Sequence, residues 1–223
     1  MMRSVLTLVF VCTAVSAYAQ DTRASVSGTV SAANMASHTD PSFAAAFGYR
    51  FTDVVGLELE ATVVPTLSAP FPGATIQGSL LAAASPVPIA QIFPTPTFSN
   101  PGGRAVIFSN NVRVHIPTTA ARIVPYFVAG GGVANIRRTA DFNFPTPILP
   151  VPLEAIGLTP LRFTTSTQHV SASASQLALT IGGGLGVRAA SRLWIDADLR
   201  MFRLMGDTDQ NLGRFGVGAR YTF

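Results

Sequence analysis

The 223-residue sequence is poor in charged residues and contains no lysine. Charged residues make up 12% of the chain, and all 15 basic residues are arginine; a typical soluble domain is roughly 25% charged. A single cysteine excludes a disulfide scaffold. Beyond residue 19, no apolar run reaches the ~18 residues that a transmembrane helix needs. The net charge of +4 is not clustered, so we expect no nucleic-acid partner.

The first 19 residues have the features of an export signal. Arg3 supplies a positive charge, residues 5–15 form an apolar run, and Ala17 and Ala19 fit the small-residue cleavage rule. We predict a signal peptide over 1–19, cleaved after Ala19, and a mature domain over 20–223. The alternative, an N-terminal anchor helix, would need a longer apolar run. The cysteine, Cys12, lies within this segment and follows Val11 rather than a small residue, so we expect no lipidation.

Hydrophobicity in the mature chain alternates with period 2, which is typical of β-strands with two different faces. Eight segments show it: 24–33, 42–51, 55–64, 105–116, 123–134, 176–188, 193–201 and 213–223. Their connections alternate between short and longer, and the two longest are expected to be loops over 65–103 and 135–175. Short turns at one end and long loops at the other indicate an all-β fold, an eight-stranded antiparallel up-and-down transmembrane β-barrel.

The polar faces of these segments carry charges of both signs, which could neutralise each other inside a narrow barrel. We expect this lumen charge network to comprise Arg50, Glu58, Glu60, Arg113, Arg188, Asp196, Asp198, Arg200, Arg214 and Arg220. The same face is rich in small residues. Aromatic residues near strand ends would form an interfacial girdle: Tyr49, Phe51, Tyr126, Tyr221 and Phe223. The alternative is a soluble lipocalin-type barrel with the apolar face inward.

Other motifs do not reach the pattern that a catalytic or metal site needs. The glycine runs 130–132 and 182–184 lack the spacing and lysine of a phosphate loop. Asp207, Asp209 and Asn211 begin like a Ca²⁺ loop, but Leu212 stands where its glycine should be. The three histidines lie on separate segments. We therefore expect no metal, no cofactor and no enzymatic activity.

The two long connections are unusually apolar and rich in proline. The tetrapeptide Phe-Pro-Thr-Pro occurs at 93–96 and again at 144–147. Such sequences favour extended chain, and contiguous exposed apolar surface usually marks an interaction site. We expect Phe93 and Phe144 to take part in a surface that receives a hydrophobic small molecule or a surface partner.

The last ten residues, Arg-Phe-Gly-Val-Gly-Ala-Arg-Tyr-Thr-Phe, resemble the terminal assembly signal of bacterial outer-membrane proteins. Segments 47–51 and 182–187 also resemble the small eight-stranded barrels of the class that includes the OmpA membrane domain, OmpX and OmpW. The resemblance implies location in the outer membrane of a Gram-negative bacterium, among its lipids. It also implies insertion by the barrel-assembly machinery, with Phe215, Val217, Ala219, Tyr221 and Phe223 as the assembly signal.

The sequence thus predicts a non-enzymatic outer-membrane barrel with a structural or surface-interaction role through its long apolar loops. The alternative is OmpW-like transport of small hydrophobic molecules across the outer membrane. A filled eight-stranded lumen makes a porin-like open channel the weaker interpretation. An outer-membrane enzyme is a third hypothesis, but no motif in the sequence supports it.

Overall fold

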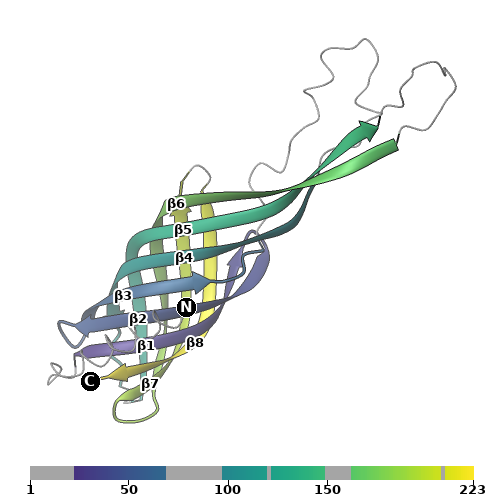
Figure 1. The fold of residues 1–223 in the computed structure, drawn as a ribbon. Coiled ribbons are helices and arrows are strands. Elements are labelled where there is room, and N and C mark those ends of the chain that lie inside the picture. Colours follow the sequence, from purple (N-terminus) through teal and green to yellow (C-terminus); the bar gives the residue numbers. More distant parts are fainter. Residues whose placement is uncertain (1–22, 69–96, 120–121, 149–161, 207–208) are drawn as a thin grey trace, which may run out of the picture.

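The computed structural model describes residues 23–68, 97–119, 122–148, 162–206 and 209–223, which form one closed antiparallel β-barrel (Figure 1). Each strand pairs with the next one in the chain, and β1 pairs with β8 to close the barrel. The predicted fold class is confirmed. The strands are β1 (Ala24–Met35), β2 (His38–Arg50), β3 (Val55–Val64), β4 (Thr97–His115), β5 (Ile123–Ile148), β6 (Arg162–Arg188), β7 (Leu193–Met205) and β8 (Gln210–Thr222).

The apolar faces of the strands point outward and the charged faces point inward. Val30, Phe108 and Leu199 are 64%, 61% and 60% exposed, whereas Glu58 and Arg214 are 3% and 1% exposed. A soluble lipocalin-type barrel would show the reverse arrangement. The outer surface therefore suits lipid. Among the described residues, no helix is long and apolar enough to cross a membrane.

The two ends of the barrel differ in their connections. Arg23, the first described residue, and Phe223 lie at the end with the short β2–β3, β4–β5 and β6–β7 connections. At the other end, the connection after β1 is tighter than expected. It has only two residues, Ala36 and Ser37, with φ of 49° and 69°. Two positive φ values at a two-residue hairpin are the signature of a type I′ turn.

The loop predicted over 135–175 is wrong for most of its length. Residues 135–148 belong to β5 and residues 162–175 belong to β6, and β4 begins at Thr97 rather than near residue 105. Past the point where β6 pairs with β7, β5 and β6 stay paired from Ile136–Ala174 to Ile148–Arg162. These 13 pairs span about 40 Å at the usual rise per residue. Figure 1 shows this extension leaving the barrel at the end away from the C-terminus.

The alternating pattern does not reveal the β6 part of the extension because that part has no buried apolar face. Residues 165–169 and 171–175 are all exposed, so both faces of β6 meet solvent there and the alternation disappears. Side-chain bonds across the three strands support it. Asp141 accepts hydrogen bonds from Asn100 (2.8 Å) and from the Nδ1 of His169 (2.9 Å). The hydrogen bond from Asn100 is the larger of two causes, with that from His169, that hold the pKa of Asp141 below its ordinary value.

Four of the five aromatic residues expected at the interface lie on the outer surface at the short-turn end. Tyr49 contacts Phe51 edge-on, with ring centroids 5.5 Å apart, and Tyr221 contacts Phe223 in the same way at 5.3 Å. The prediction for Tyr126 was wrong. It is 4% exposed and points into the barrel, where its hydroxyl bonds to Asp198.

The outward face of β7 provides a depth-dependent test of the lipid-facing assignment. Leu199→Arg places a charge in the middle of the strand and should cost about 2–4 kcal/mol of folding free energy in bilayers. Leu193→Arg places the same charge beside Tyr221 at the strand's interfacial end, where about 0–1 kcal/mol is expected. Urea unfolding in lipid vesicles, followed by the mobility difference between boiled and unboiled samples, measures both. Equal costs for the two variants would contradict the assignment.

Candidate functional site

The inward face of the barrel carries a compact group of eight charged side chains, which we call the lumen network. β3 contributes Glu58 and Glu60, and β4 contributes Arg113. The remaining members come from the last two strands: Asp196, Asp198 and Arg200 of β7, and Arg214 and Arg220 of β8. All eight are under 9% exposed. The network contains four carboxylates and four guanidinium groups, so its formal charge is zero.

The half of the network nearer the short turns is centred on Arg113. Its Nη1 donates to Glu58 at 2.9 Å, and its Nη2 donates to Asp196 at 3.0 Å. Arg220 donates to both oxygens of Asp196, through Nε at 2.8 Å and Nη2 at 3.1 Å. One carboxylate from β7 therefore joins arginines from β4 and β8 across the barrel.

The half nearer the long strands is centred on Arg200 and Arg214. Arg200 contacts three carboxylates: Glu58 at 2.7 Å, Asp198 at 2.9 Å and Glu60 at 3.1 Å. Arg214 binds both oxygens of Glu60, at 2.9 and 3.0 Å, and one oxygen of Asp198 at 3.0 Å. Ion pairs with this geometry offset much of the cost of taking charges out of water. They leave little space in the centre of the barrel.

Glycines in β6 make room for the bulkiest side chains of the lumen. A Cβ on Gly184 would lie 2.5 Å from the hydroxyl oxygen of Tyr126. That hydroxyl donates to Asp198 at 2.9 Å, and the Tyr126 ring lies 3.6 Å from the guanidinium carbon of Arg113. Tyr126 therefore belongs to the lumen. The glycine that makes room for Tyr126 lies on β6, the neighbouring strand. The sequence therefore reveals that Tyr126 points inward only when the register between β5 and β6 is known.

Above the lumen network, toward the long strands, the lumen is apolar. This layer was not expected from the sequence. Twelve buried side chains from seven strands and the segment after β3 form one cluster: Ala33, Met35, Val64, Leu67, Ala105, Ile107, Ala134, Ile136, Ala178, Phe202, Leu204 and Leu212. Arg138, also buried, follows Ile136 on the same face of β5 and donates to Gln210 and to the sulfur of Met35. The lumen is thus filled by a charged layer and an apolar layer in series.

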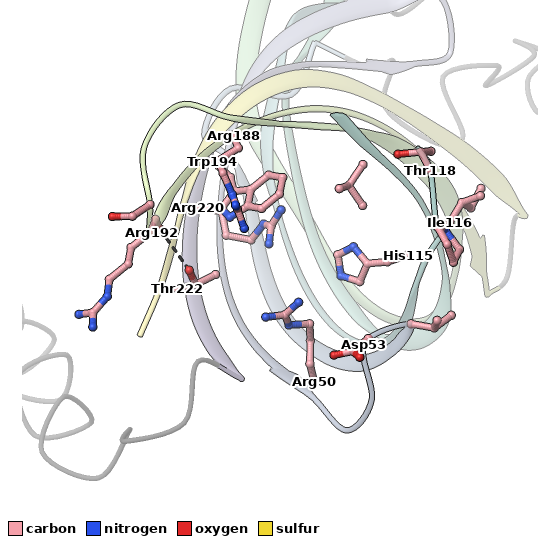
Figure 2. A pocket seen from close by; sticks show the side chains of 14 residues that line it. Arg50, Asp53, His115, Ile116, Thr118, Arg188, Arg192, Trp194, Arg220 and Thr222 are labelled. Atoms are coloured by element: carbon pink, nitrogen blue, oxygen red, sulfur yellow. Dashed lines mark hydrogen bonds between the residues drawn. The ribbon is translucent and has the colours of Figure 1, made fainter. Parts of the chain in front are cut away.

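Below the lumen network, the short-turn end opens into a cavity of about 430 Å³. We call it the vestibule and define it by Arg50, Asp53, His115, Arg188, Trp194 and Arg220, which all line it. Figure 2 shows Arg50, His115 and Arg220 reaching into this space from different parts of the wall, whereas Arg192 points away from it. The vestibule is lined by more cationic than anionic side chains.

The structure places the predicted site residues in three regions. Eight of the ten expected network residues lie together, while Arg50 and Arg188 lie at the vestibule. The five residues of the expected assembly signal share the outward face of the β8 end. Phe144 lies in β5 rather than in a loop. Ala17, Ala19 and Phe93 lie outside the described residues, as does Asp207. Among the described residues, no group of three or more His, Cys, Asp or Glu side chains could hold a metal ion.

Comparison with known proteins supports the architecture. The chain matches the family model described as "Outer membrane protein beta-barrel domain" over residues 4–223. No curated protein matches it. A major outer membrane protein from Thermus thermophilus is similar with a TM-score of 0.52 at 14% identity, covering 90% of this chain and 99% of that chain.

Two further solved structures are similar with lower scores. Ail, the attachment invasion locus protein of Yersinia pestis, gives a TM-score of 0.46 at 15% identity, covering 90% of this chain and 97% of that chain. Neisserial surface protein A gives 0.46 at 12% identity, covering 90% and 96%. At these identities the likeness concerns the fold alone.

Arg200 provides a test of the lumen network. Arg200→Leu leaves three buried carboxylates with one cation fewer, so it should lower the free energy of unfolding by about 3–5 kcal/mol. Arg203→Leu is the matched control on the same strand. Its ion pair with Asp209 is about half exposed, so its loss should cost under about 1 kcal/mol. Urea unfolding in lipid vesicles measures both.

A second substitution distinguishes charge imbalance from lost packing. Adding Glu60→Gln to Arg200→Leu restores equal numbers of positive and negative groups in the lumen network, so it should recover part of the lost stability. If the double variant were less stable than Arg200→Leu by the full cost of a second deletion, charge balance would not be the governing factor.

Proposed function

Since this chain belongs to the family of outer-membrane β-barrel domains, we propose that it serves at the cell surface as a non-enzymatic interaction protein whose binding surface is the β4–β6 extension. The barrel would anchor this surface in the bacterial outer membrane. In barrels of this kind the short turns face the periplasm and the long connections face outward. The extension stands at the end away from the short turns, so this orientation directs it to the cell exterior (Figure 1).

The observation that carries the proposal is the unpaired edge of β6. β6 pairs with β5 from Arg162 onward, but its pairing with β7 begins only at Leu177. Over residues 167–175, the other edge of β6 meets no strand among the described residues. An exposed strand edge presents backbone donors and acceptors to any extended segment that approaches it.

The side chains of this edge do not protect it. Proteins commonly protect an edge strand with charged residues, proline or a bulge. Residues 170–175 read Val-Ser-Ala-Ser-Ala-Ser, with no charge and no proline. Small side chains let another strand approach closely. The proline-rich segment 149–161, which connects β5 to β6, would add apolar contacts to the same partner.

The filled lumen supports an anchoring role over conduction. The lumen network and the apolar cluster occupy successive layers of the barrel, and both consist of side chains under 9% exposed. An eight-stranded barrel is only just wide enough for side chains to fill. A solute would have to break several buried ion pairs to pass. Transport of small hydrophobic molecules would need a route that does not cross these two layers.

Two lysines on the β6 edge test the proposal. Ser171→Lys with Ser173→Lys places positive charges where a partner strand would pair, which should reduce adhesion of expressing cells severalfold. The control is His38→Lys with Thr39→Lys, two exposed positions beside the β1–β2 turn at the same end. It should leave adhesion unchanged. The measurement compares adhesion of cells to one another and to protein-coated surfaces, with equal amounts of heat-modifiable barrel in the membrane.

Two outcomes would contradict the interaction role. In the first, the edge lysines and the control pair have the same effect on adhesion. In the second, vesicles containing the purified protein take up apolar dyes faster than empty vesicles, and deletion of residues 69–96 abolishes that uptake. The second outcome would favour transport of hydrophobic molecules.

A further inference from the structure

The vestibule has the size and shape of a binding site for a small molecule. Its volume of about 430 Å³ falls in the range of small-molecule pockets, roughly 300–1,000 Å³. It is open toward the short turns, and the Arg113–Asp196 pair of the lumen network lies on the barrel side of it. A ligand could therefore enter from the short-turn end and would be stopped by the network. The vestibule lies at the opposite end from the proposed interaction surface.

The charge of the vestibule is not balanced by the layer behind it. The lumen network holds four arginines and four carboxylates, and Arg220 is counted in it as the partner of Asp196. Arg50 and Arg188 also line the cavity and add two positive charges to the neutral network. Asp53 is the one further carboxylate among the described residues that line the cavity, and it adds one negative charge. The lining as a whole therefore favours an anion.

The arginines of the vestibule are held in position before any ligand arrives. Asp196 occupies Nε and Nη2 of Arg220. The guanidinium groups of Arg220 and Arg188 lie 5.1 and 5.0 Å from the Trp194 ring centre, as cation–π pairs do. Figure 2 shows these three side chains gathered on one side of the cavity, with Arg50 across from them.

Gly186 leaves room for the pair formed by Asp196 and Arg220. A Cβ on Gly186 would lie 2.8 Å from a carboxylate oxygen of Asp196 and 3.1 Å from Nη2 of Arg220. Any larger residue at position 186 would displace the pair that orients Arg220. The arginine side of the vestibule therefore depends on a small residue at this position of β6, besides the charges themselves.

We propose that the vestibule binds a small phosphate-bearing anion between Arg50 on one side and Arg188 and Arg220 on the other. A phosphate group presents several acceptor oxygens, and guanidinium groups donate to such oxygens in pairs. Arg50, Arg188 and Asp53 together leave one positive charge in excess, so an anionic group is attracted to the lining. The volume leaves room for an organic portion beside the phosphate. The source of that phosphate is either a soluble periplasmic molecule or a lipid headgroup.

Trp194 makes the test direct because it is the only tryptophan of the chain. The protein, purified from membranes in a neutral detergent, is titrated with inorganic phosphate and with glycerol 3-phosphate at low salt, and Trp194 fluorescence is recorded. A saturable change is expected. Arg50→Gln and Arg188→Gln should each weaken binding roughly tenfold or more, because each removes a charged donor. Calorimetric titration confirms the affinities independently of the fluorophore.

Arg203→Gln is the matched control. It removes one positive charge from the far end of β7, where Arg203 pairs with Asp209, so the affinity should stay within about twofold of the unchanged protein. The barrel fold of every variant is checked by its heat-dependent mobility. Comparable weakening by Arg203→Gln and Arg50→Gln would overturn the proposal, because general charge attraction would then explain the binding.

Two lipid samples identify the source of the phosphate. The protein is placed in phosphatidylcholine vesicles with or without phosphatidylglycerol, and glycerol 3-phosphate is added to each. Saturable binding of the soluble phosphate in both samples supports a soluble ligand. A Trp194 change that follows phosphatidylglycerol alone, and that Arg50→Gln abolishes, supports a headgroup. No saturable response to any of these probes would overturn the site.

Discussion

In hydrocarbon, each backbone N–H or C=O group without a hydrogen-bond partner costs several kcal/mol. This constraint accounts for the ring of eight strands, since the pairing of β1 with β8 removes the two free edges that an open sheet would present. Closure then fixes the rest. The side chains of alternate residues must enter a narrow lumen, and the others must face lipid. Val30 and Val217, which pair across the closing strands, are both well exposed on the outer face.

A narrow lumen can contain charges only if they neutralise one another. The eight network residues meet this requirement with four of each sign, contributed by strands that lie on different sides of the barrel. Their ion pairs join β3 and β4 to β7 and β8, which are distant in sequence. They act as cross-links through the interior, at the depth where the outer face meets lipid. The glycines of β6 serve the same end, because they provide the volume that Tyr126, Arg200 and Trp194 occupy.

The two ends of the barrel meet different requirements. At the short-turn end, strands finish near the membrane surface, and aromatic pairs such as Tyr221–Phe223 mark the outer rim while arginines line the inner one. At the other end, three strands continue past the barrel as a sheet in which both faces of β6 meet solvent. The backbone no longer needs closure there because water can satisfy an edge. The same strand, β6, is therefore covered on both edges within the membrane and on one edge beyond it.

Much of this architecture could be predicted from local pattern. Alternation with period 2 identified all eight strands and the outward faces of seven of them, since lipid-facing positions are mostly apolar. The segment of β5 is apolar on both faces, so its outward face did not follow from the pattern. The charged inward residues followed from the same alternation. Alternation arises because one face of a strand meets lipid. Residues 135–148 and 162–175 are strands with no lipid-facing side, so the pattern did not reveal them. Tyr126 was misplaced because an aromatic residue near a strand end suits both a girdle and a lumen.

Tertiary structure alone decided which inward residues meet. Arg113 lies 55 and 83 residues from Glu58 and Asp196 along the chain, and only the register of the closed barrel brings them within bonding distance. The same register separates the inward face into a vestibule, a charged layer and an apolar layer. The sequence by itself determined which side chains face lipid and which face inward, because that depends on alternation along one strand. Their partners depend on stagger between strands, which closure of the barrel sets.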